Sequence, residues 1–154
     1  LIARKLAGPG GEDLGHVGEV VRCDTRATMA LVGAGFLPVI APVAVGDGGA
    51  VYNVNADTAA GSLAAALHAD AYIVVTDVPA VRKIPSDPST ALDRISVEEA
   101  RAMALAGAFP GGMGPKIEAA VRAVEQGAAS AVICGVEGGL KAALAREHGT
   151  QITK

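Results

Sequence analysis

Aromatic residues are scarce in this chain of 154 residues, which has no tryptophan, two tyrosines and two phenylalanines. Hydrophobic residues nevertheless make up 51% of the sequence, so the core must be built mainly from alanine, valine, leucine and isoleucine. Small aliphatic cores are typical of α/β proteins, in which helices pack closely on buried strands. The length suits a single domain.

Cysteine and histidine are also rare. Cys23 and Cys134 stand alone, which excludes a disulfide framework and makes a reduced, cytoplasmic compartment the expectation. His16, His68 and His148 have no metal-ligand spacing with them. The sequence therefore predicts no protein-borne metal cluster.

Charge of one sign is not concentrated anywhere in the chain. The formal net charge is −3 and the charged residues are spread out, so no nucleic-acid partner is predicted. The apolar stretches are too short or too interrupted to span a bilayer, and no signal peptide is visible. These absences leave a globular protein with a small-molecule ligand as the expectation.

The most informative motif is Gly-Gly-Met-Gly-Pro-Lys at residues 111–116, directly before an amphipathic run from Ile117 to Gly127. Glycines let the backbone approach a ligand, and Pro115 suits the first turn of a helix. Lys116 then lies beside free backbone N–H groups and the positive end of the helix dipole, which is a favourable place for phosphate. The alternative is an ordinary glycine loop that starts a helix.

A second motif, Tyr-Asn-Val-Asn-Ala-Asp at residues 52–57, lies between a predicted short strand and a predicted helix. The loop between a strand and a helix is a usual place for ligand contacts in α/β folds. An asparagine can bind a substrate carboxylate or hydroxyl, and an aspartate can hold Mg²⁺ or a lysine. The alternative is structural, because Asn55 or Asp57 could cap the helix.

A third motif begins with the apolar run at residues 71–75, which indicates a strand buried on both faces. The run leads into Thr-Asp-Val-Pro-Ala-Val at residues 76–81. Polar residues just past the carboxyl end of a parallel strand are candidates for a ligand site. A plain turn at Asp77 before Pro79 is the alternative.

Strands and helices alternate along the predicted chain. Strands are expected at about 1–6, 17–22, 37–45, 50–53, 71–76, 130–134 and 150–153, and helices at about 24–34, 56–68, 96–106, 116–127 and 137–147. The third helix begins with a capping box formed by Ser96 and Glu99. This order predicts a three-layer α/β sandwich with a mainly parallel central sheet.

Six stretches, taken together and in order, resemble the amino acid kinase family. They are residues 14–20, 38–42, 52–57, 76–78, 111–116 and 149–152. The motif at 52–57 is most similar to the acetylglutamate kinase branch, whereas residues 109–119 and the helix at Glu98 are similar to carbamate kinase. A P-loop kinase is not indicated, because the chain has no Gly-x-x-x-x-Gly-Lys-Ser/Thr sequence.

The resemblance implies ATP-dependent phosphoryl transfer to the carboxylate of an acylated amino acid, N-acetylglutamate, with Mg²⁺ accompanying ATP. Carbamate is the alternative acceptor. By the same resemblance, Asp57 and Lys116 are catalytic, and Asn53 and Asn55 contact the substrate. The residues that it assigns to the nucleotide are Thr76, Asp77, Val78, Val81, Arg82, Gly112, Met113 and Lys116.

The resemblance also leads us to expect one partial kinase domain over residues 1–154, without the family's leading strands. It implies a substrate-side hairpin at about 1–22 and a nucleotide-binding portion at about 70–154. A homo-oligomer or a partner chain is expected to cover the open sheet edge. The isolated chain is expected to be inactive, and a non-catalytic nucleotide-binding or assembly module is the alternative function.

Overall fold

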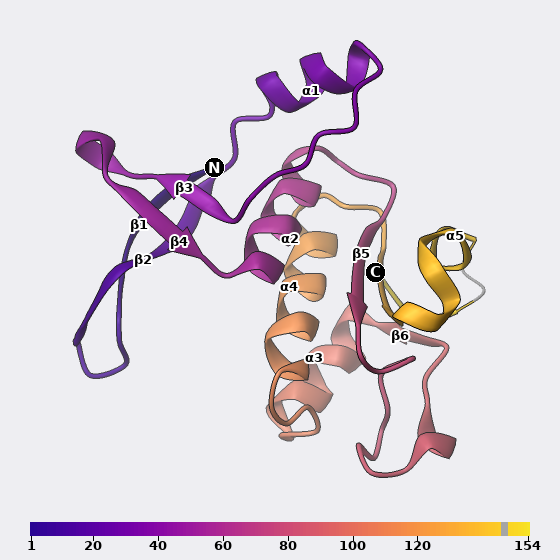
Figure 1. Ribbon diagram of the computed structural model, residues 1–154. Coiled ribbons are helices and arrows are strands. Elements are labelled where there is room, and N and C mark those ends of the chain that lie inside the picture. Colours follow the sequence, from indigo (N-terminus) through magenta and orange to yellow (C-terminus); the bar gives the residue numbers. More distant parts are fainter. Residues whose placement is uncertain (146–147) are drawn as a thin grey trace.

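A computed structural model describes residues 1–145 and 148–154, and its strands fall into two separate groups (Figure 1). The first group forms a small closed sheet in the order β1-β2-β4-β3. Its strands are β1 (Ile2–Ala7), β2 (Asp13–Arg22), β3 (Val43–Val45) and β4 (Val51–Val54). The antiparallel pair of β1 and β2 is the predicted hairpin.

The second sheet has the order β5-β7-β8-β6. Its strands are β5 (Tyr72–Thr76), β6 (Arg94–Ser96), β7 (Ala131–Gly135) and β8 (Thr150–Thr153). The pairs β5–β7 and β6–β8 are parallel, whereas β7 and β8 are antiparallel. This sheet is therefore mixed but mainly parallel.

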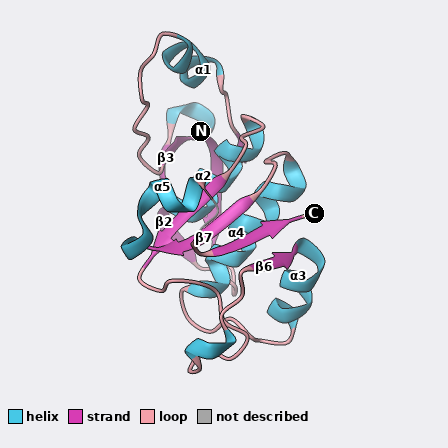
Figure 2. Cartoon of the chain, turned by 90° about the vertical axis from the view of Figure 1, so that its right-hand side faces the viewer, coloured by secondary structure: helices cyan, strands magenta, loops and turns pink. Residues whose placement is uncertain are grey.

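Helices cover both faces of the second sheet (Figure 2). On one face lie α2 (Ala56–Ala66), α3 (Val97–Leu105) and α4 (Met113–Gln126), and on the other lies the short helix α5 (Gly139–Leu144). The strands alternate accordingly, because Tyr72 and Val74 join the core under α4 while Ile73 packs toward α5. The α/β fold class and its three-layer arrangement are confirmed.

Helices α2 and α4 pack very closely, and Gly61 makes this possible. A Cβ atom at Gly61 would lie 2.9 Å from the carbonyl oxygen of Ala119 in α4. The close approach matters for the site described below, because the amino ends of α2 and α4 carry Asp57 and Lys116.

Replacing Gly61 with valine is therefore expected to lower the free energy of unfolding by about 1–3 kcal/mol, since the two helices must separate. The same change at Gly33, where an added Cβ meets nothing within 4 Å, serves as the control. It should alter stability by about 0.5 kcal/mol or less. Denaturant unfolding of both variants measures the difference, and equal losses would contradict the packing argument.

One expected strand is wrong. Residues 37–45 were predicted as a buried strand, but only Val43–Val45 pair, as β3. Leu37 is 89% and Val39 94% exposed. Their apolar pattern indicates a buried strand, but residues 37–41 have no strand neighbour in the described part of the chain.

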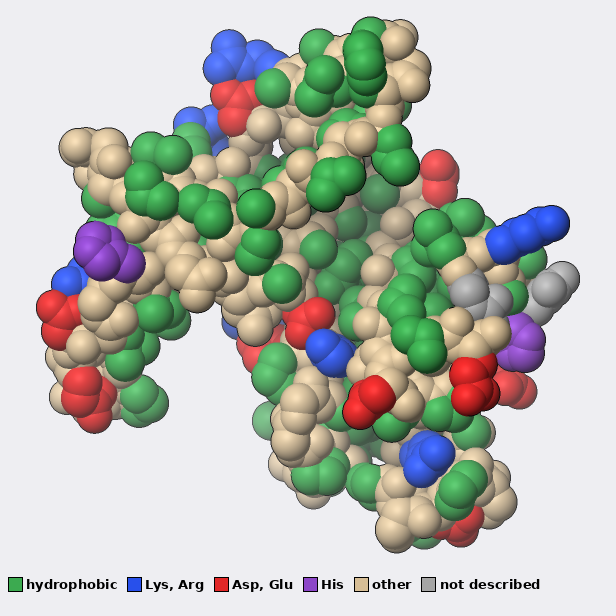
Figure 3. Space-filling view, viewed as in Figure 1, with side chains coloured by type: hydrophobic (Ala, Val, Ile, Leu, Met, Phe, Trp, Pro, Cys, Tyr) green, Lys and Arg blue, Asp and Glu red, His purple; other side chains and the backbone are tan. Residues whose placement is uncertain are grey.

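The preceding helix, α1 (Arg26–Gly33), buries none of its residues. Hydrophobic side chains gather over it at the top of the space-filling view (Figure 3). The exposed apolar residues of α1 and the following segment are Met29, Leu31, Val32, Phe36, Leu37, Val39 and Ile40. Here an apolar sequence pattern is not matched by burial.

The remaining predicted helices and strands agree with the structure or differ from it at their first or last residues. The capping box of Ser96 and Glu99 is confirmed at the start of α3. Strand β6 was not predicted, because it has only three residues and the last of them, Ser96, is the helix cap itself. Of the helix expected at 137–147, the described residues form a 3₁₀ turn, Val136–Gly138, and α5, while residues 146–147 lie outside the described part.

The connections contain further 3₁₀ turns at Asp47–Gly49 and Pro88–Thr90. Among the described residues, no helix combines the length and the hydropathy needed to cross a bilayer.

Candidate functional site

A cavity of about 300 Å³ lies where the carboxyl end of β5 meets the amino end of α4. It brings together two segments distant in sequence, residues 76–85 and 108–116. Of the residues predicted to bind a nucleotide, those that line it are Thr76, Asp77, Val78, Arg82, Gly112, Met113 and Lys116. The remaining wall residues are apolar: Phe109, two alanines (Ala80 and Ala108) and two prolines (Pro85 and Pro110).

Val81 was predicted with this group, but the structure does not place it at the cavity wall. Its side chain is 1% exposed and belongs to the main hydrophobic core. The residues on either side of it, Ala80 and Arg82, line the cavity instead. Successive side chains in extended chain point to opposite sides, so Val81 faces the core while its two neighbours face the cavity.

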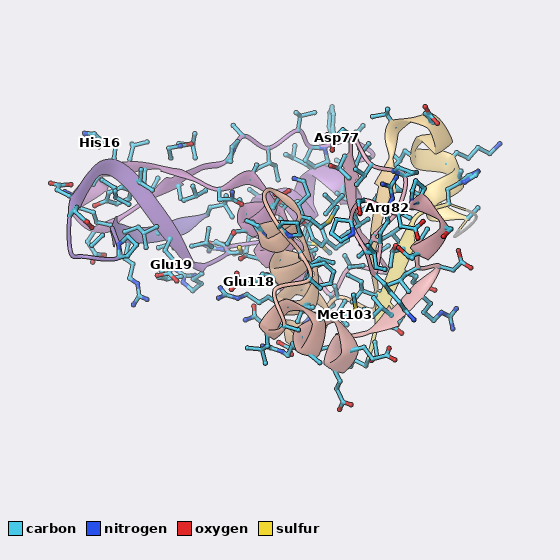
Figure 4. All side chains as sticks on the ribbon, turned by 90° about the horizontal axis from the view of Figure 1, so that it is seen from below. His16, Glu19, Asp77, Arg82, Met103 and Glu118 are labelled. Carbon is cyan, nitrogen blue, oxygen red and sulfur yellow. The ribbon has the colours of Figure 1, made fainter. Side chains whose placement is uncertain are left out.

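The strand β5 ends by presenting polar groups at the cavity. The Thr76 hydroxyl donates to Asp77 Oδ1 over 3.0 Å, and the Arg82 guanidinium donates to the Pro85 carbonyl oxygen over 3.1 Å. Figure 4 labels Asp77 and Arg82 on the part of the molecule that carries β5. With Lys116, the charged residues lining the cavity are two cations and one carboxylate, which favours an anionic ligand.

The amino end of α4 supplies the second wall. Gly112 occupies the N-cap position, and no side chain caps the helix there. Gly111 has a φ of 63°, a left-handed conformation that suits glycine. The first N–H groups of α4 therefore have no side-chain cap, and an uncapped helix start beside a lysine suits phosphate.

Lys116 is held by Asp57. Its Nζ donates to Asp57 Oδ2 over 2.9 Å, and the two side chains are 24% and 21% exposed. The ion pair joins α4 to the first turn of α2, across 59 residues of sequence. The two residues predicted to be catalytic are thus brought into direct contact, with Lys116 at the cavity wall.

Tyr72 supports this arrangement, and the sequence reasoning missed it. Its hydroxyl donates to the Asp57 carbonyl oxygen over 2.9 Å from the buried strand β5. Burial, together with the nearby Asp57 charge, raises the pKa of Tyr72, so the phenol stays a donor at physiological pH. The available signal was a tyrosine inside an otherwise aliphatic run, because a buried phenol usually needs a partner.

Asn53 and Asn55 lie outside the lining of this cavity. Asn55 caps α2, since its Oδ1 accepts from the Thr58 N–H over 3.0 Å, so the capping interpretation is confirmed. It also lines a neighbouring hollow of about 180 Å³ between β2 and α4. Glu19 and Glu118, labelled in Figure 4, lie on opposite sides of that hollow. Asn53 is exposed on β4.

The model of the amino acid kinase family matches residues 2–135. The chain belongs to the amino acid kinase family. Its membership agrees with the fold described above.

Curated relatives of this amino acid kinase chain include two acetylglutamate kinases. That of Methanopyrus kandleri is 47% identical over 126 residues, which cover 82% of this chain and 51% of the relative. That of Symbiobacterium thermophilum is 45% identical over 115 residues, which cover 75% of this chain and 39% of the relative. The chain thus spans about half, or less, of the length of these relatives.

Solved structures confirm the amino acid kinase fold. An N-acetylglutamate synthase from Neisseria gonorrhoeae, complexed with coenzyme A and L-arginine, matches with a TM-score of 0.81 and 27% identity, covering 100% of this chain and 36% of that one. Carbamate kinase from Giardia lamblia bound to AMP-PNP matches with a TM-score of 0.72 and 23% identity, covering 99% and 51%. The second likeness speaks for the fold alone.

Proposed function

We propose that this chain forms the nucleotide side of an ATP-dependent kinase that phosphorylates the carboxylate of N-acetylglutamate. The observation that carries the proposal is the cavity walled by the start of α4 with Lys116 and by the end of β5 with Asp77. Its net positive lining and free helix N–H groups suit the phosphates of ATP. Relatives named acetylglutamate kinase at 45–47% identity support the choice of acceptor.

In this proposal, Lys116 stabilises the charge of the phosphoryl group as it transfers. Phosphoryl transfer needs positioning and charge stabilisation more than covalent help from the protein. Asp57 keeps the Lys116 ammonium at the cavity wall through their 2.9 Å contact. Tyr72 in turn holds the first turn of α2, which carries Asp57.

Mg²⁺ is proposed to arrive with ATP rather than to sit in a protein-built site. Among the described residues, no group of three histidine, cysteine, aspartate or glutamate side chains could hold a metal ion. Mg²⁺ in kinases is usually held by substrate phosphates and one or two carboxylates, and Asp77 at the cavity wall fits that donor set. When bound, the ion would neutralise phosphate charge.

The acceptor side is assigned to Asn53 and Asn55 as a proposal. Asn55 uses its side-chain oxygen to cap α2, so its substrate contact would come from the amide nitrogen. Asn53, exposed on β4, has its side chain available. Carbamate remains the weaker acceptor candidate, because that likeness lies at 23% identity.

Alanine variants of the two asparagines are expected to behave differently in a kinase that contains this chain. Asn53→Ala should raise the KM for the amino-acid substrate about tenfold to a hundredfold with the ATP KM nearly unchanged, as for loss of one hydrogen bond to a charged group. Asn55→Ala should also lower the free energy of unfolding by about 1 kcal/mol, because the cap is lost. Steady-state kinetics and thermal unfolding separate the two, and equal stability losses would remove Asn53 from the site.

A second candidate function is a nucleotide-binding module without turnover. It is favoured by the match to a structure named N-acetylglutamate synthase, since one fold can host different activities. An ATP titration combined with a kinase assay on N-acetylglutamate distinguishes the two candidates. Binding without phosphorylation by the complete protein would favour the module.

The residues of this chain alone are proposed to bind nucleotide without useful turnover. Turnover needs ATP and the acceptor to be held together in one geometry, because misplacement of reacting groups by even ~1 Å can cost on the order of 100-fold in rate. Strand β5 has β7 as its neighbour in the described sheet and lies at its edge. A second copy or a partner chain covering that edge stays a prediction, as do the domain limits at about 1–22 and 70–154.

A further inference from the structure

The motif Gly-Thr-Gln-Ile at residues 149–152 has no role in the function proposed above. In the structure it starts β8, and Thr150 is 0% exposed. The Thr150 hydroxyl accepts from the Val81 N–H over 2.8 Å and donates to the Leu92 carbonyl oxygen over 2.6 Å. One buried hydroxyl therefore bridges two backbone groups that are far from it in sequence.

Those two groups form the base of the loop that walls the cavity. The Leu92 N–H donates to the Val81 carbonyl oxygen over 2.8 Å, and Arg82 pairs with Ala91 as an isolated bridge. Within this loop, Arg82 and Pro85 line the cavity. Fixing Val81 and Leu92 therefore fixes the point from which that wall extends.

The two hydrogen bonds of Thr150, to Val81 and to Leu92, form what we call the Thr150 clamp, and a neighbouring bond extends it. The Gln151 N–H donates to the Asp93 carbonyl oxygen over 2.9 Å, which anchors the outgoing chain to β8. The Val81 side chain is 1% exposed in the core, directly before Arg82. A shift at Val81 would therefore carry the Arg82 guanidinium with it.

We propose that Thr150 is a positioning residue for the nucleotide, which acts by holding the base of the loop at residues 81–92. The inference rests on the proposed nucleotide site. Removing the hydroxyl would leave the Val81 N–H and the Leu92 carbonyl without their partner in the interior, and such groups are costly to leave unpaired. The loop would relax toward water, and its cavity wall would move with it.

Thr150→Val and Thr150→Ser separate this role from simple packing. Valine keeps the shape of threonine and removes both hydrogen bonds, whereas serine keeps the hydroxyl and loses a methyl group. Ser130→Ala is the matched control for loss of a buried hydroxyl. Ser130 Oγ donates to the Asp70 carbonyl oxygen over 3.0 Å, just before the amino end of β7, whereas the cavity lies at the carboxyl end of its parallel neighbour β5.

The test measures amide hydrogen exchange and ATP affinity on the 154-residue chain. Thr150→Val should speed exchange at Val81 and within residues 82–92 about tenfold or more and weaken ATP binding by a similar factor. Thr150→Ser should restore both toward the original values. Ser130→Ala should lower the melting temperature while leaving both readouts unchanged.

Unchanged exchange at residues 81–92 in Thr150→Val, or the same loss in the serine variant, would overturn the positioning role. Faster exchange in the valine variant with unaltered ATP affinity would also overturn it, because the loop would then not position the nucleotide. If the unaltered chain does not bind ATP, the nucleotide site itself fails. The exchange data then show whether the clamp exists without it.

Discussion

Replacing Lys116 with alanine in a kinase that contains this chain is expected to lower kcat about 100- to 1000-fold, the range seen when one group that stabilises transition-state charge is removed. Binding of ADP should weaken only several-fold. The reason is that the Lys116 charge is needed most while the phosphoryl group transfers, and an interaction made mainly in the transition state appears in kcat. Single-turnover kinetics and an ADP titration measure the two quantities.

Lys141→Ala is the matched control, because Lys141 is an exposed lysine on α5, on the other face of the sheet. It should change neither quantity. Asp57→Asn should lower kcat in the same direction as Lys116→Ala, and the double variant should lose much less than the product of the two losses, since the residues form one ion pair. Equal, small effects of Lys116→Ala on kcat and ADP binding would indicate a structural surface lysine.

Filling the cavity is expected to abolish nucleotide binding. Ala80 lines the 300 Å³ cavity, and a tryptophan there would occupy space that the nucleotide needs. The affinity for ATP should fall about 100-fold or more, equivalent to ~2.7 kcal/mol of binding free energy. Isothermal titration calorimetry on the 154-residue chain measures this loss.

The control is Ala104→Trp. Ala104 is exposed on α3 and lines a separate groove between α3 and α4. This variant should bind ATP as the original chain does, and both variants should keep their melting temperatures within a few degrees. Unaltered ATP binding by Ala80→Trp would place the nucleotide elsewhere on the molecule.

Several features follow from short stretches of sequence because their causes are local. The capping box of Ser96 and Glu99 lies within one helical turn, and the structure shows both of its hydrogen bonds. The apolar run that forms β5 and the glycine-rich start of α4 depend on neighbouring residues in the same way. The alternation of strands and helices then limited the fold class to α/β.

The sequence pattern predicted burial wrongly where burial depends on a segment that is distant in sequence. Residues 37–41 have the composition of a buried strand, yet Leu37 and Val39 are exposed because no described strand lies beside them. Val81 was grouped with the nucleotide residues, but its side chain is buried in the core, whereas the next residue, Arg82, lines the cavity. Propensity describes a residue's own preference and not which face it presents.

The sequence by itself determined the residue types of the site: a lysine at a helix start, an aspartate at another, and polar residues after a buried strand. Only the tertiary structure decided which of them meet. The Asp57–Lys116 contact spans 59 residues and exists because α2 and α4 approach closely at Gly61. The Thr150 clamp on Val81 and Leu92 depends likewise on β8 lying beside the base of that loop, and contacts between distant segments are set by packing rather than by any local pattern.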